Sequence, residues 1–217
     1  MTRNATHGLG SAGFTIHEVL IATTLGLLVM GGFLSAYSFQ LFSMQDQVNQ
    51  LHVQTTARSI VDLFAREVRR AGTNPTCAQN IAGIALATAT QLRIQSDFNE
   101  SGDIDAPNED VTYRYDPAAH TIERVSGGVP ETLATNIDPS GSVIRYFDDA
   151  GQELKPDPAL TASQRAAVRR VRIELNLSAH ATNPHHSVAS RAQVSTDVDV
   201  RNRYFAGQVS CGAQNGG

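Results

Sequence analysis

The sequence predicts an α+β fold in which one long N-terminal helix packs on an antiparallel β-sheet. Proline is absent from Phe14 to Gly72, so nothing in this stretch interrupts a helix. Its second half repeats apolar residues at three- and four-residue steps, which is typical of an amphipathic helix. Beyond Pro75, short segments alternate apolar and polar residues between turn signals, which is typical of half-buried strands.

The first part of the expected helix is apolar enough to cross a membrane. Residues 19–39 form a run of 21 residues in which two threonines and two serines are the only polar residues, and about 20 apolar residues span a bilayer. Glu18 is the only formally charged side chain from Phe14 to Phe42. We therefore predict a transmembrane helix over residues 14–42. Arg3 and His7 precede it, which favours an N-terminus in the cytoplasm and the rest of the chain in the periplasm.

The order of the leader and the apolar run is reversed from that of a secretory signal. Such a signal has its apolar stretch before the cleavage site, whereas here Gly13 precedes it. Cleavage between Gly13 and Phe14 would remove the polar leader, residues 1–13, and keep the helix. The new amino group on Phe14 would lie one helical turn from Glu18 and could neutralise its carboxylate within one helix or between staggered helices. We assign Gly13 and Phe14 to processing and Glu18 to assembly.

The soluble domain is expected over residues 43–217 and begins with an amphipathic helix over 43–71. The whole helix, from about Thr15 to Arg70, would be roughly 85 Å long. Gly72 and Pro75 should end it. Two interpretations of Gly31-Gly32 stay open, a bend in the membrane half or close helix packing. The basic cluster Arg66, Arg69 and Arg70 is expected to be a solvated helix end.

The β-rich region is expected over residues 77–217. A short helix is expected over Thr161–Ala167, capped by Thr161 or Ser163. The predicted strands are Ile84–Thr88, Gln91–Gln95, Val111–Tyr115, Thr121–Val125, Ser142–Phe147, Val171–Leu177 and Gln193–Val200.

The sequence carries few signs of catalysis. It contains no phosphate-binding loop, no His-Glu-x-x-His motif and no Gly-x-Ser-x-Gly elbow, so we predict a protein that is not an enzyme and has no catalytic residues. The His185-His186 pair lacks a nearby third ligand for a metal. A net charge of −4 argues against nucleic acid as a partner. Cys77 and Cys211 can form a disulfide outside the cytoplasm, or they are two unrelated thiols.

One acidic segment has the spacing of a calcium-binding loop. Oxygen-bearing side chains alternate in it, and Gly102 stands at the sharp turn, although Asn108 occupies the twelfth position and Glu109 comes one residue late. The alternative is an acidic hairpin turn without a metal. No cofactor is required by the sequence beyond this candidate Ca²⁺ site. Its predicted ligands are Asp97, Asn99, Ser101, Asp103 and Asp105.

Three segments resemble one protein family. Gly13-Phe14-Thr15-x-x-Glu18 followed by the apolar run resembles the class III signal of type IV pilins and type II secretion pseudopilins, although His17 stands where that family usually has an aliphatic residue. Residues 59–72, with a cysteine soon after, look like the helix end of PilW-type minor pilins. Residues 195–203 are similar to the last strand of that group. The J-type pseudopilin of type II secretion shares the helix-end pattern and remains the close alternative.

The resemblance implies a processing and assembly pathway. A membrane aspartyl prepilin peptidase would cut after Gly13 and methylate the amino group of Phe14. The subunit would wait in the inner membrane and then join other major and minor pilins through its N-terminal helix, in a type IV pilus on the cell surface. The expected function is that of a minor pilin near the tip that helps to initiate assembly. The alternatives are a J-type pseudopilin or a membrane-tethered adhesin.

Overall fold

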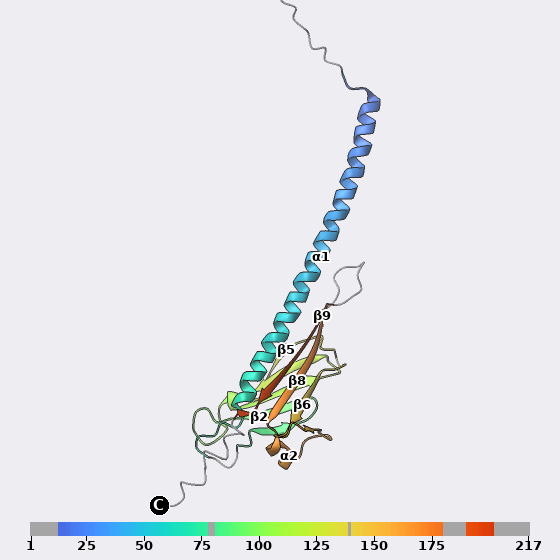
Figure 1. Cartoon of the computed structure of the whole chain (residues 1–217). Coiled ribbons are helices and arrows are strands. Elements are labelled where there is room, and N and C mark those ends of the chain that lie inside the picture. The colour runs from blue at the N-terminus through green and yellow to red at the C-terminus, as the bar shows by residue number, and fades with distance from the viewer. Residues whose placement is uncertain (1–12, 78–80, 139, 180–189, 202–217) are drawn as a thin grey trace, which may run out of the picture. The chain divides into compact units, whose positions relative to one another are not determined.

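The computed structural model describes residues 13–77, 81–138, 140–179 and 190–201. The chain divides into two compact units, residues 1–45 and 46–217, and each is considered by itself. Helix α1 (Ile16–Arg70) contributes to both units (Figure 1). The predicted helix is confirmed to within one residue at its N-terminal end.

In the first unit, α1 is an unbroken helix through Gly31 and Gly32. All its side chains from Ile16 to Leu41 are exposed. The hydroxyls of Thr23 and Thr24 donate to carbonyl oxygens three and four residues earlier, at 2.9–3.0 Å. These hydroxyls are therefore satisfied by their own helix and present no unpaired donor to an apolar environment.

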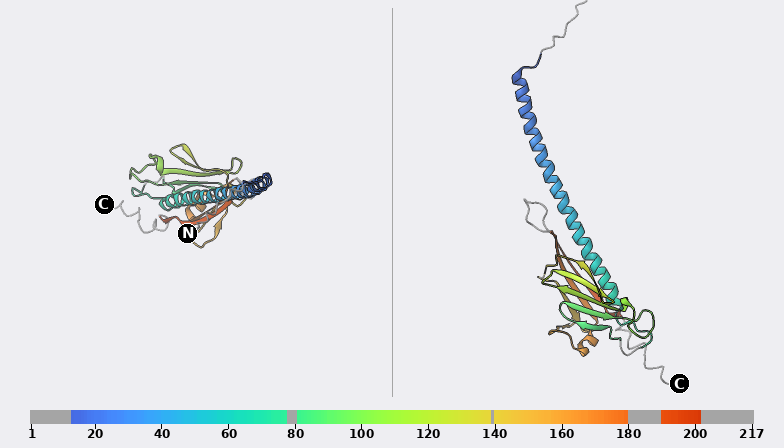
Figure 2. Two further views of the ribbon diagram at one scale, coloured as in Figure 1. Left: turned by 90° about the horizontal axis from the view of Figure 1, so that it is seen from above. Right: turned by 180° about the vertical axis from the view of Figure 1, so that it is seen from behind.

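The second unit contains two antiparallel sheets, which form distinct layers (Figure 2). The first sheet has the strand order β1-β2-β3-β4-β5, and its strands are β1 (Ile84–Ala87), β2 (Gln91–Gln95), β3 (Asp110–Asp116), β4 (Thr121–Ser126) and β5 (Val129–Ala134). The second has the order β7-β6-β8-β9, and its strands are β6 (Val143–Phe147), β7 (Glu153–Leu154), β8 (Arg170–Ala179) and β9 (Ser190–Asp199).

Every predicted strand is present, with differences at the ends. Strand β5 was not predicted, because Pro130 and a largely exposed sequence hide the alternation expected of a strand. The short strand β7 was not predicted either. Helix α2 (Ala162–Ala167) matches the expected short helix, and the Thr161 hydroxyl caps it by accepting a hydrogen bond from the Gln164 N–H. A 3₁₀ turn, η1 (Pro107–Glu109), precedes β3.

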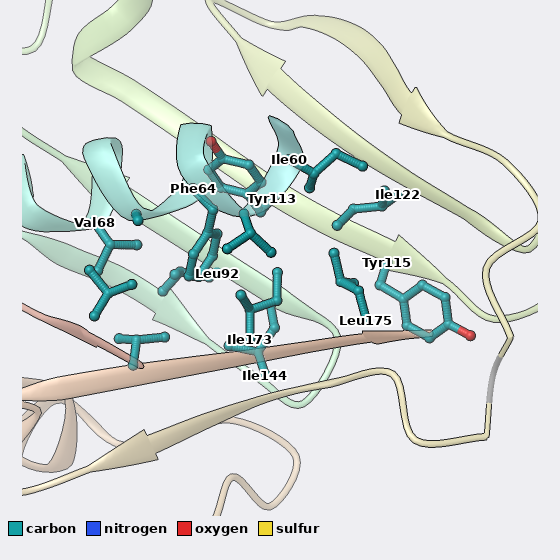
Figure 3. Close-up of a cluster of buried hydrophobic side chains, with 14 of the residues drawn as sticks. Ile60, Phe64, Val68, Leu92, Tyr113, Tyr115, Ile122, Ile144, Ile173 and Leu175 are labelled. Carbon is teal, nitrogen blue, oxygen red and sulfur yellow. The ribbon is translucent and has the colours of Figure 1, made fainter. Parts of the chain in front are cut away.

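The core of the second unit lies where the end of α1 meets strands of both sheets. Figure 3 shows Ile60, Phe64 and Val68 of the helix pointing toward side chains of β2, β3, β6 and β8. Phe64 is fully buried, and its ring meets that of Tyr113 edge to face with centroids 5.1 Å apart. The amphipathic pattern thus predicts the buried face correctly over residues 57–68, whereas Met44, Val48 and Leu51, which belong to the same pattern, are 51–64% exposed.

Candidate functional site

Helix α1 begins with a capping box made by Thr15 and Glu18. The Thr15 N–H and hydroxyl donate to Oε2 of Glu18 at 2.9 and 3.0 Å, and the Glu18 N–H donates back to the Thr15 hydroxyl at 3.4 Å. This reciprocal pattern satisfies donors that a helix start otherwise leaves unpaired. The Thr-x-x-Glu spacing that signals it is present in the sequence, although our sequence analysis gave Glu18 a role in assembly alone.

The capping box also fixes where the Glu18 carboxylate lies. Both donors of Thr15 approach the same oxygen, Oε2. Among the described residues, none donates a hydrogen bond to the other oxygen, Oε1. Glu18 is therefore held at the helix start by neutral donors, with its other carboxylate oxygen open to a further donor.

The predicted cleavage bond precedes the helix. Gly13 and Phe14 are non-helical and exposed, and the Phe14 side chain is 86% accessible. A Cβ atom at Gly13 would meet nothing within 4 Å. The bond between the two residues is thus in accessible, irregular backbone, as a protease substrate requires. Residues 1–12 of the predicted leader lie outside the described residues.

The first unit presents an apolar helix without a polar face. Its large exposed side chains include Leu27, Leu28, Val29 and Phe33, each at least 70% accessible. The helix is long and apolar enough to cross a membrane. A Cβ atom added at Gly26, Gly31 or Gly32 would meet nothing within 4 Å, so another helix can approach this surface closely.

A buried ion pair fastens the end of α1 to the first sheet. The Arg124 guanidinium on β4 donates to Oε1 of Glu67 through Nε at 3.0 Å and Nη2 at 2.7 Å. The Tyr113 hydroxyl on β3 donates to Oε2 of the same carboxylate. The Arg124 and Glu67 side chains are only 13% and 15% exposed. Burial, with the Glu67 charge beside it, raises the pKa of Tyr113, so this phenol stays protonated and donates.

The acidic segment between β2 and β3 is organised around Glu109. Its side chain is 1% exposed, and its carboxylate accepts four backbone N–H bonds of 2.8–3.2 Å. The donors are Phe98, Asn99, Asp105 and Ala106. These bonds, that from Ala106 foremost, hold the pKa of Glu109 at about 2, although burial opposes them. Four donors use the lone-pair sites of a carboxylate, so Glu109 has none left for a cation in this conformation.

The five predicted calcium ligands lie in the same loop but bond mainly to the loop itself. The buried Asp97 carboxylate accepts from the Ser101 and Gly102 N–H groups, at 3.2 and 3.0 Å, and from the Thr76 hydroxyl. The Asn99 amide donates to Asp105 at 2.7 Å. Across the parts of the chain that the structure describes, no group of three or more His, Cys, Asp or Glu side chains is placed to hold a metal ion. Calcium binding stays a prediction that depends on rearrangement of this loop.

Of the remaining predicted site residues, those that the structure describes lie near the end of α1. Cys77 is disulfide-bonded and has a left-handed backbone conformation. Cys211 lies outside the described residues, so the pairing of these two cysteines stays a prediction. Arg66, Arg69 and Arg70 are exposed, as expected for a solvated helix end, and the Arg70 guanidinium lies 3.7 Å from the centroid of the Phe98 ring. The His185-His186 pair is also outside the described residues.

Comparisons with protein-family models, with curated proteins and with solved structures give no match to this chain.

Proposed function

We propose that this chain is a minor pilin, a prepilin-type subunit that is cleaved after Gly13 and takes part in type IV pilus assembly. The observation that carries the proposal is helix α1. Its residues 19–39 form an exposed apolar run, whereas its residues 53–68 supply the buried face of an α+β domain. A bare apolar helix needs an apolar environment, which lipid provides before assembly and neighbouring helices provide in a filament.

Processing needs a bond that a peptidase can reach. The backbone at Gly13 and Phe14 is exposed and precedes the helix, and glycine offers no side chain to obstruct a narrow active site. Cleavage there leaves the α-amino group of Phe14 at the head of the apolar helix. By resemblance to prepilins, this amino group would then be methylated.

Glu18 would set the axial register of subunits. The capping box holds Oε2, and Oε1 stays available to the Phe14 amine of a neighbouring subunit. In apolar surroundings an unpaired carboxylate costs several kcal/mol, so a neighbour that supplies the cation is favoured over one that does not. The partners are therefore other pilin helices, and the prepilin peptidase acts before them in the inner membrane.

Intact-mass measurement tests the processing step. The chain is expressed in cells with an active prepilin peptidase, and wild type is expected to lack residues 1–13. Gly13→Val should stay uncleaved, because the added side chain blocks the site. Gly10→Val, a matched change in the leader, should be cleaved normally. Retention of residues 1–13 by the wild-type chain would contradict the proposal.

Two substitutions separate the capping and charge roles of Glu18. Glu18→Gln keeps hydrogen-bond acceptors for Thr15 but removes the charge, whereas Glu18→Val removes both. Both variants should insert in the membrane, and both should be depleted from sheared pili if the charge is required. Normal incorporation of Glu18→Gln would exclude pairing with the Phe14 amine.

A complementation experiment distinguishes the alternative function. If the wild-type chain restores type II secretion, and not piliation, to a deletion strain, the chain is a J-type pseudopilin.

A further inference from the structure

Among the residues that the structure describes, the two sheets have four edge strands, and three of these are protected against pairing with another chain. Strand β7 has only two residues. Strand β5 carries Pro130 and a register shift in its pairing with β4. Strand β1 is covered by the segment before α2, because the Leu160 N–H donates to the Ala87 carbonyl at 2.9 Å and Thr88 bridges to Ala159. The fourth edge, β9, has none of these features.

Strand β9 is ten residues long and pairs with β8 in an unbroken register from Arg170↔Asp199 to Ala179↔Ser190. It contains no proline, lysine or bulge. Within the described part of the chain, no element other than β8 pairs with β9. In Figure 1 the two strands lie side by side, with β9 as the last strand of its sheet.

The hydrogen bonds of β8 reveal which β9 backbone groups face outward. The Asn176 carbonyl accepts from the Asp138 N–H at 2.7 Å, and the Ser178 N–H donates to the Asn136 carbonyl at 3.0 Å. Even-numbered β8 residues thus bond away from β9, and odd-numbered ones bond toward it, because alternate residues of a strand face opposite sides. The register then pairs odd β8 residues with even β9 residues, for example Ile173 with Thr196.

It follows that the odd-numbered residues of β9 direct N–H and C=O groups to the free edge. Their side chains are exposed on the outer face of the sheet, whereas Ala192 and Val198 are buried on the inner face. None of the described residues donates to or accepts from these outward backbone groups. The five residues are Arg191, Gln193, Ser195, Asp197 and Asp199.

We propose that β9 is a docking edge that accepts an extended strand of another protein by β-strand addition. The incoming strand runs antiparallel to β9, alternates apolar side chains toward the inner face, and carries arginine or lysine beside Asp197 and Asp199. Strand β8, which pairs with the opposite edge of β9, already shows such a charge pair: the Arg172 guanidinium donates two hydrogen bonds of 2.8 Å to the Asp197 carboxylate. The partner thus extends the sheet and repeats the charge pattern of β8.

A second copy of this chain fits the edge less well. Parallel, in-register pairing of two β9 strands would place Asp197 beside Asp197 and Asp199 beside Asp199, which is repulsive. Antiparallel pairing would match Arg191 with Asp199, but it would reverse one copy's helix residues 46–70 relative to the other's. This second objection rests on the proposed function, in which both copies are anchored in one membrane.

Hydrogen exchange and a peptide probe test the edge with the full chain in detergent micelles. In the free chain, amides of the odd-numbered β9 residues should exchange fast and those of the even-numbered residues slowly. The probe is a synthetic peptide of the β8 sequence, RVRIELNLSA, and it should slow exchange of the odd-numbered amides. A peptide with both arginines replaced by glutamate should bind more weakly.

Ser195→Pro removes one outward N–H without touching the β8–β9 ladder, and Ser195→Val keeps that N–H. Ser195→Pro should weaken peptide binding about tenfold or more with little change in melting temperature, while Ser195→Val binds like wild type. Slow exchange of the odd-numbered amides in the free chain, equal binding by the two variants, or no peptide binding would each overturn the proposal. If the chain dimerises and Ser195→Pro abolishes the dimer, the occupant of the edge is a second copy of the chain and not another protein.

Discussion

The ion pair between Glu67 and Arg124 should contribute far more to stability than an exposed pair of similar geometry. Glu67→Gln keeps the shape of the side chain but removes its charge, so Arg124 is left without a counter-ion at 13% exposure. Breaking a buried pair by removing one partner costs about 3–5 kcal/mol. Because both side chains retain some contact with water and glutamine can still accept from Tyr113, we expect the lower end, about 3 kcal/mol.

The chain contains a matched control in Arg172 and Asp197. These two side chains also form a two-bond contact, at 2.8 Å for each bond, but they are 37% and 40% exposed. Exposed pairs typically contribute about 0.2–1 kcal/mol, because water screens the charges. Asp197→Asn should therefore destabilise the domain by less than about 1 kcal/mol.

Differential scanning calorimetry of both variants in detergent measures the contrast. For a domain of this size, each kcal/mol lowers the melting temperature by roughly 2–4 °C. Glu67→Gln should thus melt roughly 6–12 °C below wild type, and Asp197→Asn no more than about 4 °C below. Equal shifts for the two variants would refute the reasoning that burial decides the contribution of these pairs.

Three further predictions concern the loop and the disulfide. The pKa of Glu109 lies below its ordinary value of 4.5, so its stabilising effect is present above about pH 4.5 and is lost as pH falls toward about 2. In an acid titration of stability, Glu109→Gln should flatten this pH dependence. The control Glu131→Gln, at an exposed position of β5, should leave it unchanged. If the loop rearranges to bind calcium, about 5 mM Ca²⁺ should raise the melting temperature of wild type but not of Asp103→Ala, since extracellular calcium modules bind at about 0.1–1 mM. An unchanged melting temperature of wild type would mean that the segment is an acidic turn without calcium. If Cys77 pairs with Cys211, free-thiol labelling of protein from the periplasm should find no reactive cysteine. The disulfide would close a long loop and stabilise the fold by about 4–5 kcal/mol at most. Two labelled thiols would exclude the bond.

Much of the fold follows from local patterns. The absence of proline and the three- and four-residue spacing are sufficient to place α1, because both act within one or two helical turns. Alternation places β3, since Tyr113 and Tyr115 face the core while Arg114 faces water. Strand β5 has no such pattern, because it lies at an edge and buries little.

The interactions at the candidate site were harder to predict because they join distant residues. Glu67 and Arg124 are 57 positions apart, and nothing local marks them as partners. Glu109 was considered as a late calcium ligand, whereas its carboxylate is fully used by backbone donors. The Thr15–Glu18 cap was not predicted either, although its two residues lie within one turn of helix and have the spacing of a capping box.

The way in which Glu109 closes its loop has a consequence for how this surface can evolve. All four donors to its carboxylate are main-chain N–H groups, which every residue except proline supplies. Exposed side chains of the loop, such as those of Asn99 and Glu100, are therefore not needed for that closure. Glu100 and Gly102 are constrained in another way, because their backbone φ angles of +60° and +83° disfavour most other residues. Because Glu109 and the buried Asp97 hold the loop mainly through main-chain N–H groups, the loop can change its outward chemistry, and whatever it contacts, while its backbone course is retained.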